Sequence, residues 1–523
     1  MNLYSSLAAA VRRCSLILFV SSVACAESAQ WSHNPVSGDW NTPANWTPAI
    51  VPNGPADIAV FGPTNGTAVS LSQDTEVNGI TFTSAATNPY TIGVGADLVL
   101  TLSGAGVTNN SGITQVLSCN EGGEILFANN ASASNTLITS YQGWLQFSNS
   151  STAAAAEIEN SGSILFSNSA SAGGANIINF SPSQMAFVDS SSAGNANIQS
   201  YDNTLIDFFD TSTANSATIQ SLGKITFHDF STGGVARVRI QRLDPVPASG
   251  VLDISPHSAP GITLGSVEGD GDIFLGANTL TVGANNLDTT FSGAIHDGSF
   301  FLDVPTDETA QASVIENRAL TAPAGGSLTK VGSGTLTLEG FNTYTGDTNV
   351  NGGVLQIDGS VSSNVSVQRR ATLAGSGTVD GNLVNNGGTI SPGAPTGAPG
   401  TLTVTGSYTT ARRVAGTLVI HLAGQNADQI SVLNVEGNAA LGGCLEVALS
   451  PGFIPQIGQS FTFIDYASYS GCFRLRNSVF DHGTKRWSVV YGPTSAALVV
   501  VSNRHLDPAA DLSSSQLTRD YPR

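Results

Sequence analysis

The sequence predicts an all-β protein, a single-stranded right-handed parallel β-helix with coils of about 20 residues. A phenylalanine recurs six times, separated by 20, 19, 21, 21 and 19 residues: Phe127, Phe147, Phe166, Phe187, Phe208 and Phe227. A branched aliphatic residue follows each Phe after eleven residues, and Asn or Asp follows after two. Only the distance from the aliphatic residue to the next Phe varies. A unit that keeps its strands and changes length at one corner is typical of a solenoid.

Each Phe ends an alternating triplet, such as Ile164-Leu165-Phe166. This alternation predicts a short strand with one buried face. A second strand contains the aliphatic residue, as in the stretch AEIEN at 156–160. The Asn, Asp and Ser residues between strands favour corners because they tolerate left-handed backbone. We therefore expect coils about 4.8 Å apart, with the six Phe side chains stacked inside.

Two other interpretations fit the repeat less well. A disordered Ser/Asn/Gly/Ala-rich segment would not hold aromatic positions in phase over six copies. The strands of a membrane barrel need roughly 9–11 residues to cross the bilayer, whereas these alternating runs are much shorter.

Composition limits the function classes. The chain has 523 residues, 57 of them Gly, 11% charged residues and a net charge of −19. No basic patch could neutralise the phosphates of a nucleic acid, so we expect no nucleic-acid partner. Since a solenoid grows along one axis, we expect one continuous rod of about twenty coils between Trp31 and Val501.

The N-terminus is typical of a secretory signal. Arg12 and Arg13 precede an apolar run from Cys14 to Ala24, and Ala24-Cys25-Ala26 gives an A-x-A cleavage pattern. We expect cleavage after Ala26 rather than lipid modification of Cys25. No other apolar stretch is long enough for a spanning helix, so no transmembrane segment is expected in the mature chain.

Three cysteines would remain after cleavage, namely Cys119, Cys444 and Cys472. Three cysteines make no disulfide framework. Cys444 and Cys472 are candidates for a bridge between neighbouring coils, which the extracellular redox state permits, or for two small wall residues.

The pattern changes beyond the six-copy block. Residues 327–357 read SLTKVGSGTLTLEGFNTYTGDTNVNGGVLQI, with alternating strands at 336–338 and 354–357. This segment resembles the autotransporter-associated β-strand repeat of passenger regions in large secreted bacterial proteins. The segment with Trp40 and Trp46 is similar to the Trp-rich opening of the same class. The resemblance implies a β-helix on or released from the cell surface, without a catalytic site. A polar tail follows Val501, so the C-terminal translocator barrel of that class is not expected here.

On this interpretation the chain divides into seven segments. They are a signal peptide (1–26), a Trp-rich cap with the first coils (27–115), the six-copy block (116–245), further coils (246–326), the autotransporter-associated region (327–410), C-terminal coils (411–502) and a polar tail (503–523).

Some β-helices are polysaccharide lyases or hydrolases, which need clustered carboxylates on one face. Asp189, Asp210 and Asp229 form such a column. The same column carries Asn in the earlier copies, which favours a corner role over catalysis.

Three other candidates are weaker. Asp481-His482-Gly483 resembles a fragment of polygalacturonase signatures but lacks the companion Asp motifs. Gly269-Asp270-Gly271-Asp272 is one incomplete copy of a calcium-binding repeat, and a turn is the better interpretation. Trp31, Trp40 and Trp46 favour a hydrophobic cap over a carbohydrate-binding platform, because an open solenoid end exposes strand edges. No nucleophile elbow and no C-x-x-C or H-E-x-x-H motif is present.

We therefore expect no catalytic, cofactor-binding or metal-ligating residue and no cofactor. The function expected is a secreted or surface-exposed scaffold, adhesin-like or matrix-forming and non-catalytic, with extracellular or cell-surface polysaccharide as its partner. The alternative is a polysaccharide-active or polysaccharide-binding β-helix protein. The oligomeric state is left open.

Overall fold

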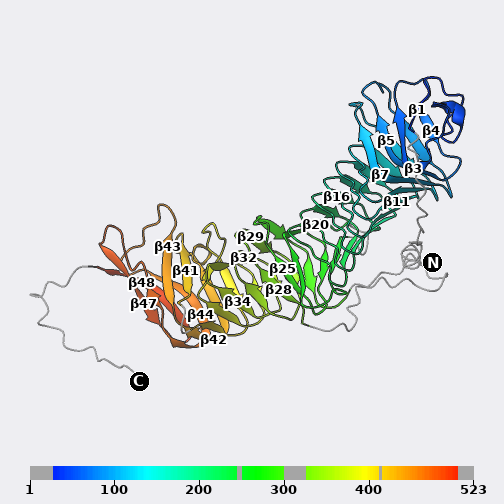
Figure 1. The fold of residues 1–523 in the computed structure, drawn as a ribbon. Coiled ribbons are helices and arrows are strands. Elements are labelled where there is room, and N and C mark those ends of the chain that lie inside the picture. Colours follow the sequence, from blue (N-terminus) through cyan, green and yellow to red (C-terminus); the bar gives the residue numbers. More distant parts are fainter. Residues whose placement is uncertain (1–27, 244–249, 300–324, 412–414, 504–523) are drawn as a thin grey trace, which may run out of the picture.

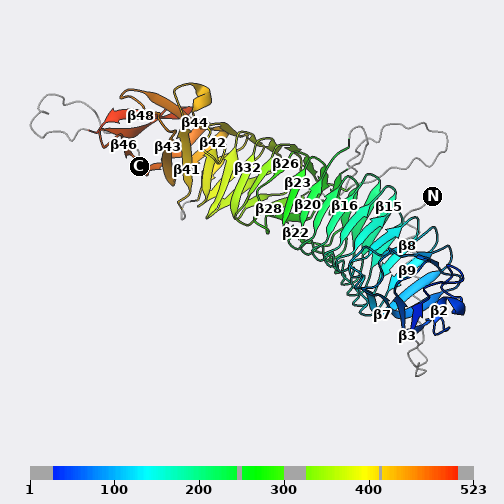
Figure 2. The ribbon, with the colours of Figure 1, turned by 90° about the horizontal axis from the view of Figure 1, so that it is seen from above.

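The computed structural model describes residues 28–243, 250–299, 325–411 and 415–503. The expected signal peptide and residues 504–523 of the expected tail lie outside these ranges. The described chain forms one elongated rod of stacked coils (Figures 1 and 2). In Figure 1 the rod bends in the region of β20 and β25. Neighbouring coils pair in parallel along the rod, so the predicted parallel β-helix is confirmed.

Three walls run along the rod, which we name walls A, B and C. Wall A contains the Phe strands: β1 (Ala29–Trp31), β3 (Gly54–Phe61), β5 (Thr75–Phe82), β7 (Val99–Asn109), β9 (Glu124–Phe127), β11 (Trp144–Phe147), β13 (Ser163–Phe166), β15 (Ser183–Phe187), β17 (Thr204–Phe208), β19 (Lys224–Phe227), β21 (Val251–Asp253), β24 (Asp272–Phe274), β27 (Ala294–His296), β30 (Phe341–Asn342), β33 (Ser360–Val361), β36 (Thr378–Val379) and β39 (Thr401–Val404). The step from β27 to β30 is made by Thr343 N donating to Ile295 O at 2.8 Å.

Wall B is a continuous stack of 18 strands, close to the expected number of coils. They are β4 (Ala68–Ser70), β6 (Thr91–Val94), β8 (Val116–Cys119), β10 (Leu137–Ser140), β12 (Glu157–Asn160), β14 (Asn176–Asn179), β16 (Asn197–Ser200), β18 (Thr218–Ser221), β20 (Arg237–Ile240), β23 (Ser266–Gly269), β26 (Thr289–Phe291), β29 (Thr335–Leu338), β32 (Gly353–Ile357), β35 (Ala371–Gly375), β38 (Thr389–Pro392), β41 (Thr417–Leu422), β43 (Cys444–Leu449) and β45 (Arg474–Leu475).

Wall C changes along the rod. In the six-copy block it is a column of single-residue parallel bridges: Ser132, Thr152, Ser171, Ser192, Thr213 and Thr232. Full strands follow: β22 (Gly261–Leu264), β25 (Thr279–Val282), β28 (Ser327–Lys330), β31 (Thr348–Val350), β34 (Val365–Gln368), β37 (Leu383–Asn386) and β40 (Tyr408–Thr410). The rod bends in the region where wall C widens (Figure 1).

The six Phe side chains form a ladder inside wall A. All are fully buried, with successive ring centroids 4.7–4.8 Å apart and ring planes within 9° of parallel. The aliphatic residue of each copy, such as Ile158 or Ile177, is likewise buried and pairs with its counterpart on the next coil. The predicted inward register is therefore confirmed.

Two columns of left-handed residues turn the corners. The Asx residues after the Phe strands have φ between 50° and 60°, as predicted: Asn129, Asn149, Asn168, Asp189, Asp210 and Asp229. A second column, which the sequence analysis missed, turns the corner from wall C to wall B: Ser134, Ala154, Gly173, Gly194, Asn215 and Gly234. The residue types in this column vary, so no single residue type in the sequence indicated the corner.

The ends of the rod are closed differently. At the N-terminal end, Trp31, Trp40 and Trp46 are buried against Phe61, with ring centroids 5.0–6.0 Å apart. This confirms the predicted cap. Next to it lie the 3-10 helix η1 (Pro43–Asn45) and β2 (Trp46–Thr47), antiparallel to β1.

At the C-terminal end, β42 (Val432–Leu441) and β44 (Ser460–Gly471) bridge walls A and C, after the 3-10 helix η2 (Ala427–Gln429). Parallel stacking stops there, so the expectation that coils continue to Val501 was wrong for the last strands, which pair antiparallel instead. An antiparallel sheet of β46 (Val479–Phe480), β47 (Lys485–Tyr491) and β48 (Ser495–Ser502) pairs with residues 460–465 of β44 and covers that part of its edge.

Replacing Phe166 with Ala should destabilise the protein by roughly 3–5 kcal/mol, since it removes a buried ring from the middle of a ladder. Gln146→Ala, at an outward position of the same wall, should stay within about 0.5 kcal/mol of wild type. Denaturant unfolding followed by circular dichroism measures both. Equal losses of stability in the two variants would contradict the inward orientation of the Phe side chains.

Replacing Ala154 with Gly should stabilise the protein by roughly 0.5–1 kcal/mol. Ala154 has a φ of 52°, and a left-handed L-residue costs about 1–2 kcal/mol, which exceeds the entropy that Gly adds to the unfolded chain. The neighbouring Ala153→Gly, at a buried position without positive φ, should destabilise instead. If both variants lose stability in the same unfolding assay, the strain at Ala154 is not real.

Candidate functional site

The column of Asx carboxylates and amides is tied into the corners. A side-chain oxygen of Asp189 accepts from Asn168 N at 2.7 Å, Asp210 accepts from Asp189 N at 2.9 Å, and Asp229 accepts from Asp210 N at 3.2 Å. Each carboxylate thus accepts the backbone N–H of the corner before it. This is the corner role that the sequence favoured.

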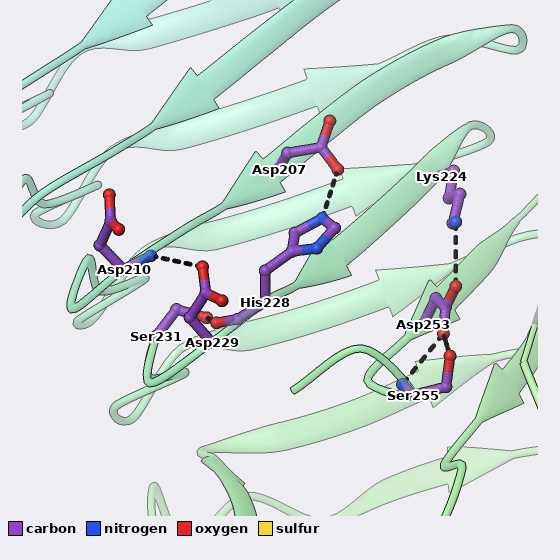
Figure 3. Close-up of polar contacts among 8 residues, drawn as sticks. All are labelled: Asp207, Asp210, Lys224, His228, Asp229, Ser231, Asp253 and Ser255. Atoms are coloured by element: carbon purple, nitrogen blue, oxygen red, sulfur yellow. Dashed lines mark hydrogen bonds and ion pairs between the residues drawn. The ribbon is translucent and has the colours of Figure 1, made fainter. Parts of the chain in front are cut away.

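Charged side chains gather on the outer face of wall A, over β17, β19 and β21. Figure 3 shows the His228 ring directed at Asp207, with 3.3 Å between Nε2 and Oδ1. Lys224 Nζ lies 2.9 Å from Asp253 Oδ2, and both side chains are largely buried. Asp253 also accepts from Ser255 Oγ at 2.6 Å. Asp207, an outward position of its triplet, is therefore engaged rather than free.

The charged face continues onto the next coils. Arg242 Nη2 lies 2.8 Å from Asp272 Oδ2, and His296 Nε2 lies 3.5 Å from Asp272 Oδ1. The other ring nitrogen of His296, Nδ1, lies 3.0 Å from Thr343 Oγ1. One nitrogen of the His296 ring therefore faces the Thr343 hydroxyl, and the other faces the Asp272 carboxylate.

Neither His–Asp pair is completed as in nucleophilic catalysis, where the hydroxyl bonds the imidazole and the imidazole bonds the carboxylate. Ser231 Oγ donates to the backbone oxygen of His228 at 2.7 Å, not to its ring, and is buried. At His296, the 3.5 Å contact is long for a hydrogen bond, and Arg242 already engages Asp272.

The Thr343–His296–Asp272 arrangement was not found from the sequence. Its members lie 24 and 47 residues apart, outside the 20-residue period. Only the pairing of β24 with β27 and the step from β27 to β30 bring them together.

The remaining sequence candidates lie at turns or in the cap. Gly269–Asp272 forms the turn between β23 and β24, as expected, and Asp270 accepts from Arg242 N at 2.9 Å. Asp481, His482 and Gly483 all have positive φ in the turn between β46 and β47. The indole N–H groups of Trp31 and Trp40 donate to Gly66 O and Pro52 O, so these rings offer no carbohydrate platform.

Cys444 and Cys472 lie on neighbouring coils, as one of the two sequence interpretations requires, since Cys444 pairs with Arg474. Both thiols are free in the structure, Cys444 buried and Cys472 exposed. Within the described ranges, no three His, Cys, Asp or Glu side chains converge as metal ligands would. No helix in those ranges approaches the length and apolarity that crossing a bilayer requires.

The resemblance to autotransporter passenger regions rests on the segment that contains β28 to β32. A family profile described as a passenger-associated-transport-repeat matches residues 328–357. The chain contains an autotransporter-associated repeat. This confirms the resemblance drawn from residues 327–357, and we call residues 328–357 the PATR segment.

Two matches to curated proteins cover short stretches. Both are named "Extracellular serine protease" and come from Serratia marcescens, one 54% identical over 68 residues and the other 56% over 54 residues. These stretches are 13% and 10% of this chain but only 6% and 5% of the relatives. The solved Haemophilus influenzae Hap adhesin aligns with 85% of this chain and 64% of its own, at 12% identity and a TM-score of 0.28.

The PATR segment places a lysine inside the β-helix. Lys330 is 1% exposed and lies between Val282 and Val350 on the neighbouring coils. Its Nζ donates to Val331 O at 2.7 Å and to Gly352 O at 3.3 Å. Burial lowers the pKa of Lys330 from 10.5 to about 8, and the charge of Asp288 opposes this shift.

Stability should therefore rise with pH between about 8 and 10.5. In that window the unfolded chain keeps the Lys330 proton that the folded chain has released. The gain should be on the order of 2 kcal/mol relative to Lys330→Met, which lacks the titrating group. Urea unfolding of both proteins at pH 7.5 and pH 10 measures the difference. Identical pH dependence in the two proteins would contradict the buried charge.

Proposed function

We propose that the protein is a secreted or surface-exposed β-helical scaffold, adhesin-like and non-catalytic. The observation that carries the proposal is the PATR segment, which forms part of an uninterrupted parallel β-helix. The word "extracellular" in the names of the Serratia relatives supports a location outside the cell.

The walls suit a scaffold because outward positions carry small polar side chains. On wall C, Thr281 and Thr329 stack outward on successive coils. Further along, Asn382 Nδ2 donates to Asn364 Oδ1 at 3.0 Å in an exposed amide ladder. Such ladders give long, regular, wettable surfaces, the usual working part of a solenoid.

Localisation and adhesion can be tested together. In the source cells, an internally tagged protein should be removed by protease added to intact cells or be found in the medium, and a deletion strain should lose attachment to glycan-coated surfaces. Re-expression of the full chain should restore attachment. A protein that stays protected inside intact cells would refute the proposal.

The competing function is a hydrolase. Two observations favour testing it: the Thr343–His296–Asp272 arrangement, and the protease names of the relatives, which this chain matches over only 6% and 5% of their length. We expect purified protein to release neither peptides from casein nor reducing ends from pectin or alginate, with or without calcium. Turnover that disappears in His296→Ala but persists in His482→Ala, a turn histidine, would replace the scaffold by an enzyme.

A further inference from the structure

The strongest unassigned feature is a groove on the outer face of wall B. It has a volume of about 680 Å³ and crosses the coils that contain β20, β23, β26, β29 and β32. One outward column forms its floor: Arg239, Glu268, Thr290, Thr337 and Gln356. At about 4.8 Å per coil, this floor is about 19 Å long.

A loop from further along the rod covers one end of the groove. Ala394, Pro395 and Thr396, which follow β38, line it together with the floor. The loop is closed by Ala394 N donating to Ala398 O and by Gly397 N donating to Ala394 O, both at 2.9 Å. Gly397 has a φ of 98°, and a Cβ there would lie 3.3 Å from the His421 ring, so the loop lies directly against β41. A hydrogen-bonded loop therefore forms this end of the groove.

Most side chains of the floor have no protein hydrogen-bond partner among the described residues, although Gln356 Nε2 donates to Asp358 Oδ2 at 2.5 Å. Arg237 Nη2 bonds Glu268 Oε2 at 3.1 Å, which occupies Glu268 and leaves Arg239 unpaired among the described residues. Within the same ranges, the hydroxyls of Thr290 and Thr337 also bond no protein group. A threonine hydroxyl both donates and accepts, and a guanidinium only donates.

These groups select the ligand. Among the described residues, the lining offers no aromatic or large aliphatic side chain to anchor a peptide or an apolar molecule. The carboxylates of Glu268 and Asp288 oppose a polyanion, as does the net charge of −19. A molecule whose own groups both donate and accept at regular intervals matches the column.

We propose that this groove binds a linear neutral glycan, laid along the rod axis with about one sugar ring per coil. Arg239 contacts hydroxyls at one end, Thr290 and Thr337 contact the middle, and Gln356 and the 394–396 loop hold the other end. The inference names a ligand class for the proposed adhesin-like function and rests on it.

Calorimetric titration of the purified chain with cellotetraose, xylotetraose, mannotetraose and tetragalacturonate tests the site. At least one neutral tetrasaccharide should bind, and Arg239→Ala should weaken it about tenfold, as expected for the loss of a charged hydrogen bond. Thr337→Trp, which fills the middle of the groove, should abolish binding. Gln199→Ala, on the same outward column two coils before Arg239 and outside the groove, should bind as wild type does.

Circular dichroism of each variant separates a lost site from a lost fold. Three results would overturn the proposal: no neutral tetrasaccharide binds the wild type, only tetragalacturonate binds, or Gln199→Ala weakens binding as much as Arg239→Ala. Cell-surface localisation does not enter this measurement, so failure here leaves the scaffold role to its own test.

Discussion

Parallel pairing of each coil with the next is the constraint on which the rest of this structure depends. It places every side chain about 4.8 Å from the side chain at the same position of the neighbouring coil. The Phe ladder shows the consequence, with rings 4.7–4.8 Å apart and nearly parallel. An inward residue therefore packs against residues of the same type on the two neighbouring coils. This packing explains why six copies keep Phe at the same position.

The same constraint decides where the chain turns and ends. Corners need left-handed backbone at a fixed position of every coil, which Asx residues supply while their side chains bond the corner before them. Ends need something other than another coil, because a parallel stack always leaves one strand edge open. The tryptophan cluster and the antiparallel sheet of β44 and β46–β48 meet that need with different chemistry.

Contacts with other molecules can then be made only by the outward side chains, because the packed core does not constrain them. On wall A they carry ion pairs such as Lys224–Asp253, on wall C hydroxyl and amide ladders, and on wall B a polar groove under a loop. A solenoid varies these positions without disturbing its core, because each outward residue contacts mainly its neighbours along the column. The PATR segment stacks in the same way but places Lys330 inside the β-helix. There the backbone carbonyls of Val331 and Gly352 accept hydrogen bonds from its ammonium group.

The sequence by itself determined the β-helix, the inward Phe and aliphatic ladders, the Asx corner, the aromatic cap and the PATR segment. Each is a local pattern repeated in phase, so its position along the chain already fixes its position in a coil. The second corner lies seven residues after each Phe but mixes Ser, Ala, Gly and Asn, so only the structure revealed it. The tertiary structure alone also decided what depends on coils of unequal length. Thr343 meets His296 across 47 residues, and the 394–396 loop covers strands two or more coils away. No period in the sequence encodes these contacts, because they arise only when the register between irregular coils has been set by stacking.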